Sequence, residues 1–230
     1  MDKKIPTAPT SIGVIMDGNR RWAKARGVPT LLGHRAGYKK LREFRTWAMD
    51  AGVKEIIVYA FSTENWNRTK EEVGFLMDLF REVIDAMVAD AIRDNMRIIF
   101  LGERSQLPED IVRAIESAEA QTKNFDSFCY AIALSYGGRG EIIDAIHRIP
   151  ENKRATITEE EFSKLLWTKE MHDPDIIIRT SGEERLSNFL PWQSVYTELV
   201  FTKTLWPDFT EAEFHEIIQT YAARERRLGK

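Results

Sequence analysis

The stretch "IGVIMDGNRRWAK" (residues 12–24) runs from an apolar segment into an aspartate, a glycine and two arginines. Its first five residues are apolar and partly β-branched, which is typical of a strand that is buried on both faces. Asp17 and Gly18 follow at the end of this strand, and the pattern predicts the start of a helix directly behind them. A parallel sheet with functional groups at the carboxyl ends of its strands would have this local order.

The same order recurs along the chain. Short runs rich in β-branched residues alternate with longer amphipathic segments, which indicates a mostly parallel sheet covered by helices. Six strands are predicted, at 12–16, 55–61, 97–102, 128–134, 175–179 and 198–202. Helices are expected at about 37–50, 108–122, 139–148 and 210–227, with another opened by Thr69. We therefore predict one α/β domain over 12–230, preceded by a flexible extension, 1–11.

The helix opened by Thr69 has an unusually long apolar stripe. A capping box is predicted at Thr69 and Glu72, as it is at two later helix starts, Thr158 with Glu161 and Thr210 with Glu213. Apolar residues then recur at helical spacing over about 25 residues, or roughly 37 Å of helix. The stripe includes Leu76, Phe80, Val83, Ile84 and Met87. The helix either packs in the core or lines a cavity for a hydrocarbon ligand.

Composition excludes several classes of protein. The chain carries 33 Lys and Arg against 36 Asp and Glu, a net charge of −3, so no global field would attract nucleic acid. The single cysteine, Cys129, cannot form an intrachain disulfide, which fits a reducing compartment. No apolar run approaches the roughly 20 residues of a membrane helix. We expect a cytoplasmic protein, and a peripheral contact with the inner membrane surface stays open.

Polar residues are concentrated just after the predicted strands. Asp17 could hold a divalent cation, with Arg21 and the helix N–H groups holding an anion beside it, as a metal-bound diphosphate would require. An ordinary turn with an aspartate cap is the alternative. Arg68, Arg179 and Arg185 also follow strand ends, where guanidinium groups can grip phosphate oxygens.

Two further segments leave their role open. "GHRAG" (33–37) is compatible with a phosphate-cradling turn, although a lone histidine such as His34 is more often structural. Phe61 and Trp66 flank polar residues, and either line a substrate pocket or pack in the core. The chain has no P-loop, no dinucleotide-binding fingerprint and no Cys/His zinc cluster. An aspartyl-nucleophile phosphohydrolase would usually have a second acid at position 19, which is Asn.

Six motifs in order resemble those of the cis-prenyltransferases, the undecaprenyl diphosphate synthase-like family. They are "MDGNRRWAK", "GHRAG", "YAFSTENWNR", "YGGRGEI", "IRTSGEERLSNFLPWQSVYTEL" and "LWPDF". The resemblance implies a homodimer with a hydrophobic tunnel between helices and sheet. It also implies Mg²⁺-dependent addition of isopentenyl diphosphate, with cis geometry, to an allylic diphosphate primer such as farnesyl diphosphate. The product would be a polyprenyl diphosphate.

The resemblance also implies roles for residues. Asp17 would hold Mg²⁺, with Glu198 contributing, and Asn65 would position the isopentenyl group or remove its proton. The allylic diphosphate would lie near Gly18, Asn19, Arg21 and His34, and isopentenyl diphosphate near Arg179, Arg185 and Ser187. Other substrate-binding candidates are Arg20, Trp22, Phe61, Ser62, Thr63, Trp66, Arg68, and the R-x-G pair Arg227 and Gly229 from the C-terminal tail. Phe128, Met87 and Ile84 are candidates for the tunnel wall or floor, and core packing is the alternative for Phe128.

The chain departs from the family pattern at two positions that bear on the site. Thr30 stands where many members have an arginine that grips the primer, so weaker primer binding, or help from Arg35, is expected. Pro191 is expected to kink a helix in "NFLPWQ". Two rival functions remain. One is a non-catalytic partner subunit of a prenyltransferase, and the other is a Mg²⁺-dependent phosphate-ester hydrolase.

Overall fold

The computed structural model describes residues 8–224 and contains one sheet of six strands. The strands are β1 Ser11–Ile15, β2 Glu55–Ser62, β3 Met96–Leu101, β4 Phe128–Tyr136, β5 Ile176–Arg179 and β6 Glu198–Phe201. All six predicted strands are confirmed, with ends within about two residues of the prediction. β1 starts at Ser11, and the Thr10 N–H already donates to Asp175 Oδ2 at 2.7 Å. Residues 1–7 lie outside the described part.

Helices lie between consecutive strands, except between β5 and β6. The α-helices are α1 Asn19–Ala25, α2 Thr30–Asp50, α3 Lys70–Arg93, α4 Glu109–Thr122, α5 Gly138–His147, α6 Glu159–Ser163 and α7 Glu211–Ala222. Three short 3₁₀ helices are η1 Thr63–Asn67, η2 Glu151–Lys153 and η3 Trp206–Asp208. None of the helices within 8–224 is both long enough and apolar enough to cross a membrane.

The strand order places the ends of β1 and β5 side by side. The order is β3-β4-β2-β1-β5-β6, and every neighbouring pair is parallel. From β1 the chain first adds β2, β3 and β4 on one side, with β4 between β2 and β3, and then adds β5 and β6 on the other side. The order therefore reverses beside β1, and ligands of such sheets bind at this point, beyond the carboxyl ends of the strands.

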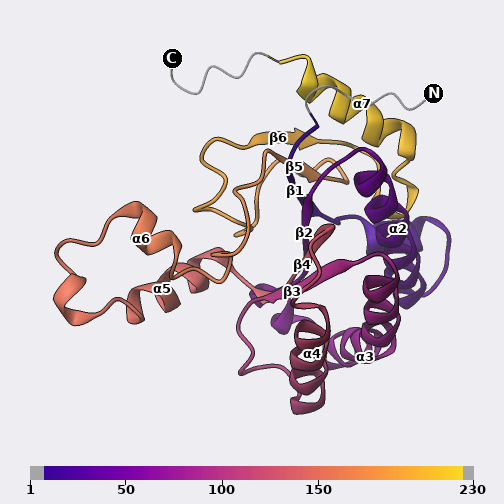
Figure 1. Ribbon diagram of the computed structural model, residues 1–230. Helices are drawn as coiled ribbons and strands as arrows, with labels where there is room; N and C mark the ends of the chain where they lie inside the picture. Colours follow the sequence, from indigo (N-terminus) through magenta and orange to yellow (C-terminus); the bar gives the residue numbers. More distant parts are fainter. Residues whose placement is uncertain (1–7, 225–230) are drawn as a thin grey trace.

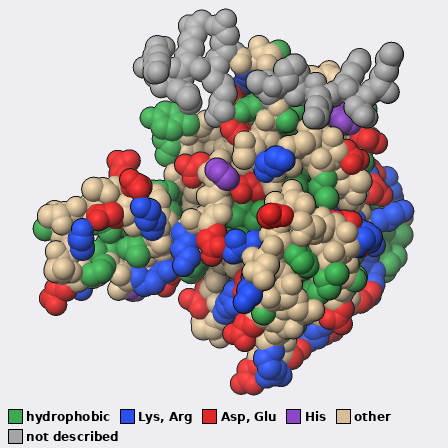
Figure 2. Space-filling model, in the orientation of Figure 1, with side chains coloured by type: hydrophobic (Ala, Val, Ile, Leu, Met, Phe, Trp, Pro, Cys, Tyr) green, Lys and Arg blue, Asp and Glu red, His purple; other side chains and the backbone are tan. Residues whose placement is uncertain are grey.

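Helices α2, α3, α4 and α7 cover one face of the sheet, whereas α5 and α6 project to the other side (Figure 1). The larger core lies under the first group and contains Ile12, Val14, Phe44 and Trp206. A smaller core on the other face contains Ile57, Ile177 and Phe189. Because both faces are covered, all five residues of β1 are buried, which explains the absence of charged residues and the apolar run that follows Ser11. On the surface in Figure 2, acidic and basic side chains are interspersed.

Helix α2 begins at Thr30, seven residues before the predicted start, and so contains the segment 33–37, for which the sequence suggests a turn. The two glycines that suggested a turn serve close packing instead. A Cβ on Gly33 would lie 2.2 Å from the carbonyl oxygen of Asn19, and one on Gly37 would lie 2.4 Å from Asn19 Oδ1. Glycine in α2 therefore allows the start of α1 to lie against it.

The expected kink at Pro191 is also wrong, because residues 184–197 form turns and no helix. Ser187, Asn188 and Leu190 have φ values of 48°, 65° and 49°, which a right-handed helix does not allow. Pro191 instead lies against Gly138 at the start of α5, where an added Cβ would come 2.0 Å from Pro191 Cδ.

Candidate active site at the ends of β1 and β5

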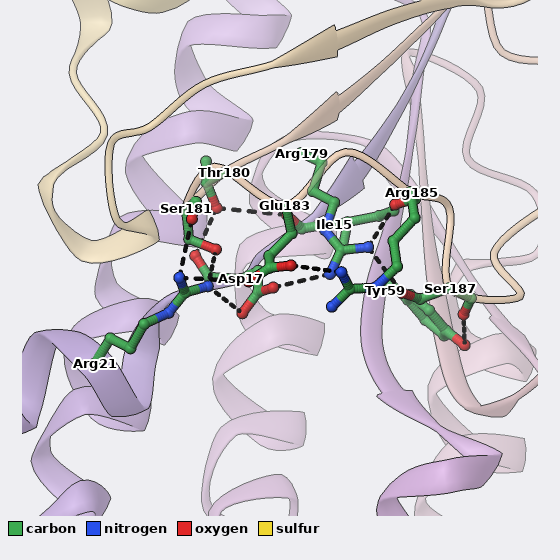
Figure 3. Close-up of polar contacts among 10 residues, drawn as sticks. All are labelled: Ile15, Asp17, Arg21, Tyr59, Arg179, Thr180, Ser181, Glu183, Arg185 and Ser187. Carbon is green, nitrogen blue, oxygen red and sulfur yellow. Dashed lines mark hydrogen bonds and ion pairs between the residues drawn. The ribbon is translucent and has the colours of Figure 1, made fainter.

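Asp17 lies two residues beyond β1, in a tight turn. Its N–H donates to the Ile15 carbonyl at 2.9 Å, and Gly18 follows with φ 113°. This conformation favours glycine, and a Cβ there would also lie 3.0 Å from Leu205 Cα. The turn directs the carboxylate toward the loop after β5 (Figure 3).

Two arginines from different elements face the Asp17 carboxylate. Arg179 Nη2, at the end of β5, donates to Asp17 Oδ2 at 2.9 Å, and Arg21 Nη2, from α1, lies 3.6 Å from Oδ1. Burial would raise the pKa of Asp17, but the hydrogen bond and charge of Arg179, together with the charge of Arg21, outweigh it and lower that pKa. The carboxylate is therefore ionised at neutral pH.

Arg179 is held rigidly at the centre of the site. Its side chain is only 4% exposed. Nη1 donates to Ser187 Oγ at 2.7 Å and to the Arg185 carbonyl. Nε is buried and, among the described residues, has no hydrogen-bond partner. A buried guanidinium with an unused donor at a strand end is suited to receive part of an anionic ligand.

Arg21 connects α1 to the turn after β5. Nη1 donates to the Ser181 carbonyl at 3.0 Å, Nη2 donates to Ser181 Oγ, and Glu183 Oε1 lies 3.6 Å away. In the same turn, Thr180 Oγ1 donates to the Asp17 carbonyl at 2.6 Å. Arg185 pairs with Glu183 and is 61% exposed, so it lies at the rim of the site.

The "LWPDF" motif supports Asp17 from behind. The Trp206 N–H donates to the Asp17 carbonyl at 3.0 Å, and Trp206 Nε1 donates to the Gly37 carbonyl at 2.9 Å. Asp208 accepts from Trp22 Nε1 at 2.8 Å and pairs with Arg26 at 3.0 Å. Trp22 is therefore a structural neighbour of this motif, and it is not among the residues that line the pockets described next.

Two pockets meet at Asp17. The first, of about 690 Å³, lies over α1 and the start of α2, and Lys24 and Thr30 are in its wall. The second, of about 710 Å³, extends toward β2 and the 187–191 segment. Five residues line both pockets, namely Met16, Asp17, Asn19, His34 and Arg68.

Both pockets have more basic than acidic residues in their walls. The first contains Arg20, Arg21, Lys24 and Arg68 against Asp17. The second contains Arg68, Arg139 and Arg179 against Asp17 and Glu64. Helix α1 has only seven residues, so these side chains, more than the helix dipole, supply the positive potential. The two pockets are therefore both basic, and they share the Asp17 carboxylate.

Glu72 is a site residue that the sequence pattern concealed. Thr69 Oγ1 accepts from the Glu72 N–H at 3.3 Å as predicted, but the Glu72 carboxylate does not return to the cap. It accepts from Arg68 Nη1 at 2.9 Å and lies 3.7 Å from His34 Nε2 and 3.9 Å from Arg20 Nε. Burial, then the charge of Arg68, lowers the pKa of His34, so the ring is neutral at pH 7.

The loop after β2 divides between pocket and core. Asn65 Oδ1 accepts from the Ser62 N–H at 3.2 Å and caps η1, and both residues line the second pocket. Phe61 is 1% exposed and packs edge to face with Trp66 at 4.9 Å, so core packing describes Phe61. Trp66 Nε1 donates to Ser135 Oγ at 3.0 Å. Thr63 lies against Gly137 and is not among the residues that line the two pockets.

The segment after β5 holds its strained conformation through contacts the sequence did not reveal. Tyr59 Oη donates to the Ser187 carbonyl at 3.2 Å, and Asn188 Nδ2 donates to Glu64 Oε1 at 3.0 Å. All four side chains line the second pocket. Backbone in sparsely populated φ regions is often found at functional sites, where surrounding contacts hold it in place.

Other predicted site residues lie elsewhere or outside the described part. Glu198 opens β6 opposite Ile176, three residues or about 10 Å along the sheet from the Arg179 end, and pairs with Arg224. The described part of the chain therefore does not bring Glu198 to Asp17. Arg227 and Gly229 lie outside the described residues. Ile84, Met87 and Phe128 are buried in the large core.

The donor set fits one particular manner of binding Mg²⁺. Within 8–224 no group of three or more His, Cys, Asp or Glu residues is arranged to hold a metal ion. Mg²⁺ commonly keeps several waters and is bound through one or two carboxylates together with substrate phosphates. Asp17 supplies one such carboxylate, with Oδ1 more than hydrogen-bond distance from Arg21. The residues therefore fit a metal ion that is held jointly with a diphosphate.

Proteins with similar sequences identify the family of this chain. Residues 15–229 match the family model described as "Putative undecaprenyl diphosphate synthase". The chain belongs to this family. It is similar to isoprenyl transferases from Thermotoga maritima, at 47% identity over 96% of this chain and 97% of that protein, and from Fusobacterium nucleatum, at 47% identity over 100% and 98%.

The fold is likewise similar to that of lavandulyl diphosphate synthase from Lavandula x intermedia, solved in complex with dimethylallyl diphosphate. The TM-score is 0.92 at 33% identity, over 97% of this chain and 99% of that one. Membership of the undecaprenyl diphosphate synthase family identifies the chain as an enzyme, a prenyltransferase that elongates prenyl chains.

Proposed function

We propose that this prenyltransferase adds isopentenyl diphosphate, in cis geometry and with Mg²⁺, to an allylic diphosphate primer such as farnesyl diphosphate. The observation that carries the proposal is the pair of basic pockets that share Asp17 and Arg68. Two diphosphates could occupy them side by side. The primer is assigned to the first pocket, at Gly18, Asn19, Arg21 and His34, and isopentenyl diphosphate to the second, at Arg179 and Ser187.

The chemistry requires that the primer's C–O bond breaks while negative charge develops on the departing diphosphate. Fixed guanidinium groups stabilise such charge because they are oriented before the reaction begins. Arg21 and Arg68 would bind the departing group, and Arg179 would hold the incoming diphosphate in line with it. Mg²⁺, when bound at Asp17, would neutralise further charge on the leaving group.

The identity of the proton acceptor stays a prediction. Asn65 lines the second pocket beside Ser62, and its side chain is held in place because it caps η1. A side chain fixed in this way can orient the isopentenyl group. An amide is a poor base, and we therefore assign the proton to the departing diphosphate rather than to Asn65. The diphosphate oxygens are the stronger acceptors in this position.

The prenyl chain would extend away from the charged groups along α3. Leu76, which is buried, lines the second pocket, and Ile84, Met87 and Phe128 continue the apolar side of this layer. A role for Phe128 in product length stays a prediction, with core packing as the alternative. The homodimer, the cytoplasmic location and a membrane contact for product release stay predictions, as do the roles of Glu198, Arg227 and Gly229.

Purified protein with labelled isopentenyl diphosphate, farnesyl diphosphate and Mg²⁺ tests the proposal. The expected outcome is a labelled lipid diphosphate whose mass grows in five-carbon steps, and which disappears when a chelator removes Mg²⁺. Release of phosphate without a lipid product would identify a hydrolase. Product formed only after a second, different subunit is added would identify a non-catalytic partner.

A further inference from the structure

A cluster of buried polar side chains lies between α2 and α3, well away from Asp17. Arg45 in α2 and Asp90 in α3 are each 4% exposed, and Arg45 Nη2 donates to Asp90 Oδ2 at 2.9 Å. Tyr130, in β4, is 2% exposed, and its ring centroid lies 6.0 Å from the guanidinium carbon of Arg45. Neither charged residue contributes to the site described above.

The cluster has unused hydrogen-bonding capacity. Arg45 Nε and Tyr38 Oη are both buried, and neither has a hydrogen-bond partner among the described residues. Asp90 is held by two additional arginines, Arg42 at 3.0 Å and Arg93 at 2.8 Å. Burial would raise the pKa of Asp90, but the arginines lower it, so the carboxylate is charged at neutral pH.

One face of α3 connects the second pocket with this cluster. Leu76 lies in the pocket wall. Leu79, Val83 and Asp90 follow at intervals of three, four and seven residues, which places all of them on one side of a helix. Asp90 is thus about 21 Å along the helix from Leu76. An apolar stripe that begins at the reaction site ends at a carboxylate.

A small cavity that is open to the surface lies beside this stripe, between α2 and α3. It has a volume of about 190 Å³; Tyr38, Leu79, Val83 and Ala86 line its inner side, and Arg35, Arg42 and Glu82 line its mouth. Helices α2 and α3 are on the same side of the sheet (Figure 1). Tyr38 and Arg45 are seven residues apart in α2, two turns on one face, so Arg45 lies beyond the cavity in the direction of Asp90.

We infer that the Arg45–Asp90 pair, with Tyr130 behind it, is the barrier that sets the greatest length of the prenyl product. This inference rests on the proposed function. A hydrocarbon chain offers no hydrogen bonds, so advancing past Arg45 would separate or desolvate two buried charges. An apolar side chain can move aside for a growing chain, whereas a buried ion pair resists displacement. Elongation therefore stops when the chain end reaches Arg45.

The main test is the variant Arg45→Val. It removes the barrier's cation and leaves Asp90 paired with Arg42 and Arg93, which are 48% and 61% exposed and can reach solvent. The double variant Arg45→Val/Asp90→Ala removes both buried charges and covers the case in which the single variant does not fold. The matched control is Arg81→Val/Asp110→Ala, which removes an exposed ion pair between α3 and α4.

The readout is the mass distribution of products made from isopentenyl diphosphate and a fixed primer. The longest product of Arg45→Val, or of the double variant, should grow by at least one five-carbon unit, while the control keeps the wild-type distribution. A folded and active variant with the wild-type longest product would overturn the inference and leave the proposed function intact. A wild-type chain that forms no prenyl product would overturn both.

Discussion

Replacing Asp17 with asparagine separates the chemical role of the carboxylate from its structural role. The amide oxygen of Asp17→Asn can still accept the hydrogen bond that Arg179 Nη2 makes at 2.9 Å. What disappears is the negative charge beside Arg21 and Arg179, and with it the ligand proposed for Mg²⁺. The variant should therefore fold as the wild type does and fail in turnover.

The structure provides the two magnitudes to compare. Exchanging a charge-assisted hydrogen bond for a neutral one costs about 1 kcal/mol of folding free energy, and less here because the Asp17 side chain is 33% exposed. One lost contact to developing charge costs about 10²-fold or more in turnover, or at least ~2.7 kcal/mol in the barrier. The expected loss of activity is thus larger than the expected loss of stability.

The assay is the initial rate of incorporation of labelled isopentenyl diphosphate at saturating Mg²⁺, with urea denaturation of the same sample. Asp208→Asn is the matched control, because Asp208 binds Trp22 and Arg26 away from the pockets. The control should keep the wild-type rate. If Asp17→Asn turned over as fast as the control, the assignment of Asp17 to the reaction would be refuted.

Three further predictions follow from the same geometry. Thr30→Arg adds a cation to the first pocket and should lower the KM for the primer roughly fivefold, from about 1 kcal/mol of additional binding, with kcat unchanged; an unaltered KM would contradict the primer's placement. Gly33→Ala forces a Cβ to within 2.2 Å of the Asn19 carbonyl and should cost about 1–3 kcal/mol in denaturation, whereas Gly74→Ala, with open space around it, should stabilise α3 by about 0.5–1 kcal/mol. Burial lowers the folded-state pKa of His34, so the stability that the neutral ring contributes is complete above the unfolded value of 6.5 and is lost as pH falls through the folded pKa. His34→Gln should therefore reduce the fall in unfolding free energy on the acidic side. Identical pH profiles of stability for the variant and the wild type would show that His34 does not titrate in this way.

The central strands could be predicted because they are buried on both faces, and burial of that kind leaves a continuous apolar run such as residues 12–15. The arginines after the strands could be placed for a related reason. Once the sheet is parallel, its topology brings Arg21 and Arg179 to one edge, whatever the details of the loops. At these positions the apolar pattern of the strands and the parallel topology of the sheet lead to the same prediction.

The errors arose where a residue's role depends on a distant neighbour. Glu72 fits a capping box in sequence, and only the positions of Arg68 and His34 in three dimensions draw its carboxylate away. The glycines at 33 and 37 resemble turn residues until Asn19 is seen to lie on them. Lys24 did leave a signal, since it follows Arg20 by four residues and so shares its helix face.

The support of Asp17 by Trp206 has a consequence for the biosynthesis of the enzyme. The backbone at position 17 is held by groups from residues 180 and 206, which leave the ribosome long after the aspartate itself. A nascent chain that ends before η3 contains Thr180 but lacks the Trp206 N–H that completes the support of the Asp17 backbone. Premature termination upstream of residue 206 should therefore yield fragments that cannot turn over substrate, even where β1 to β5 have already assembled.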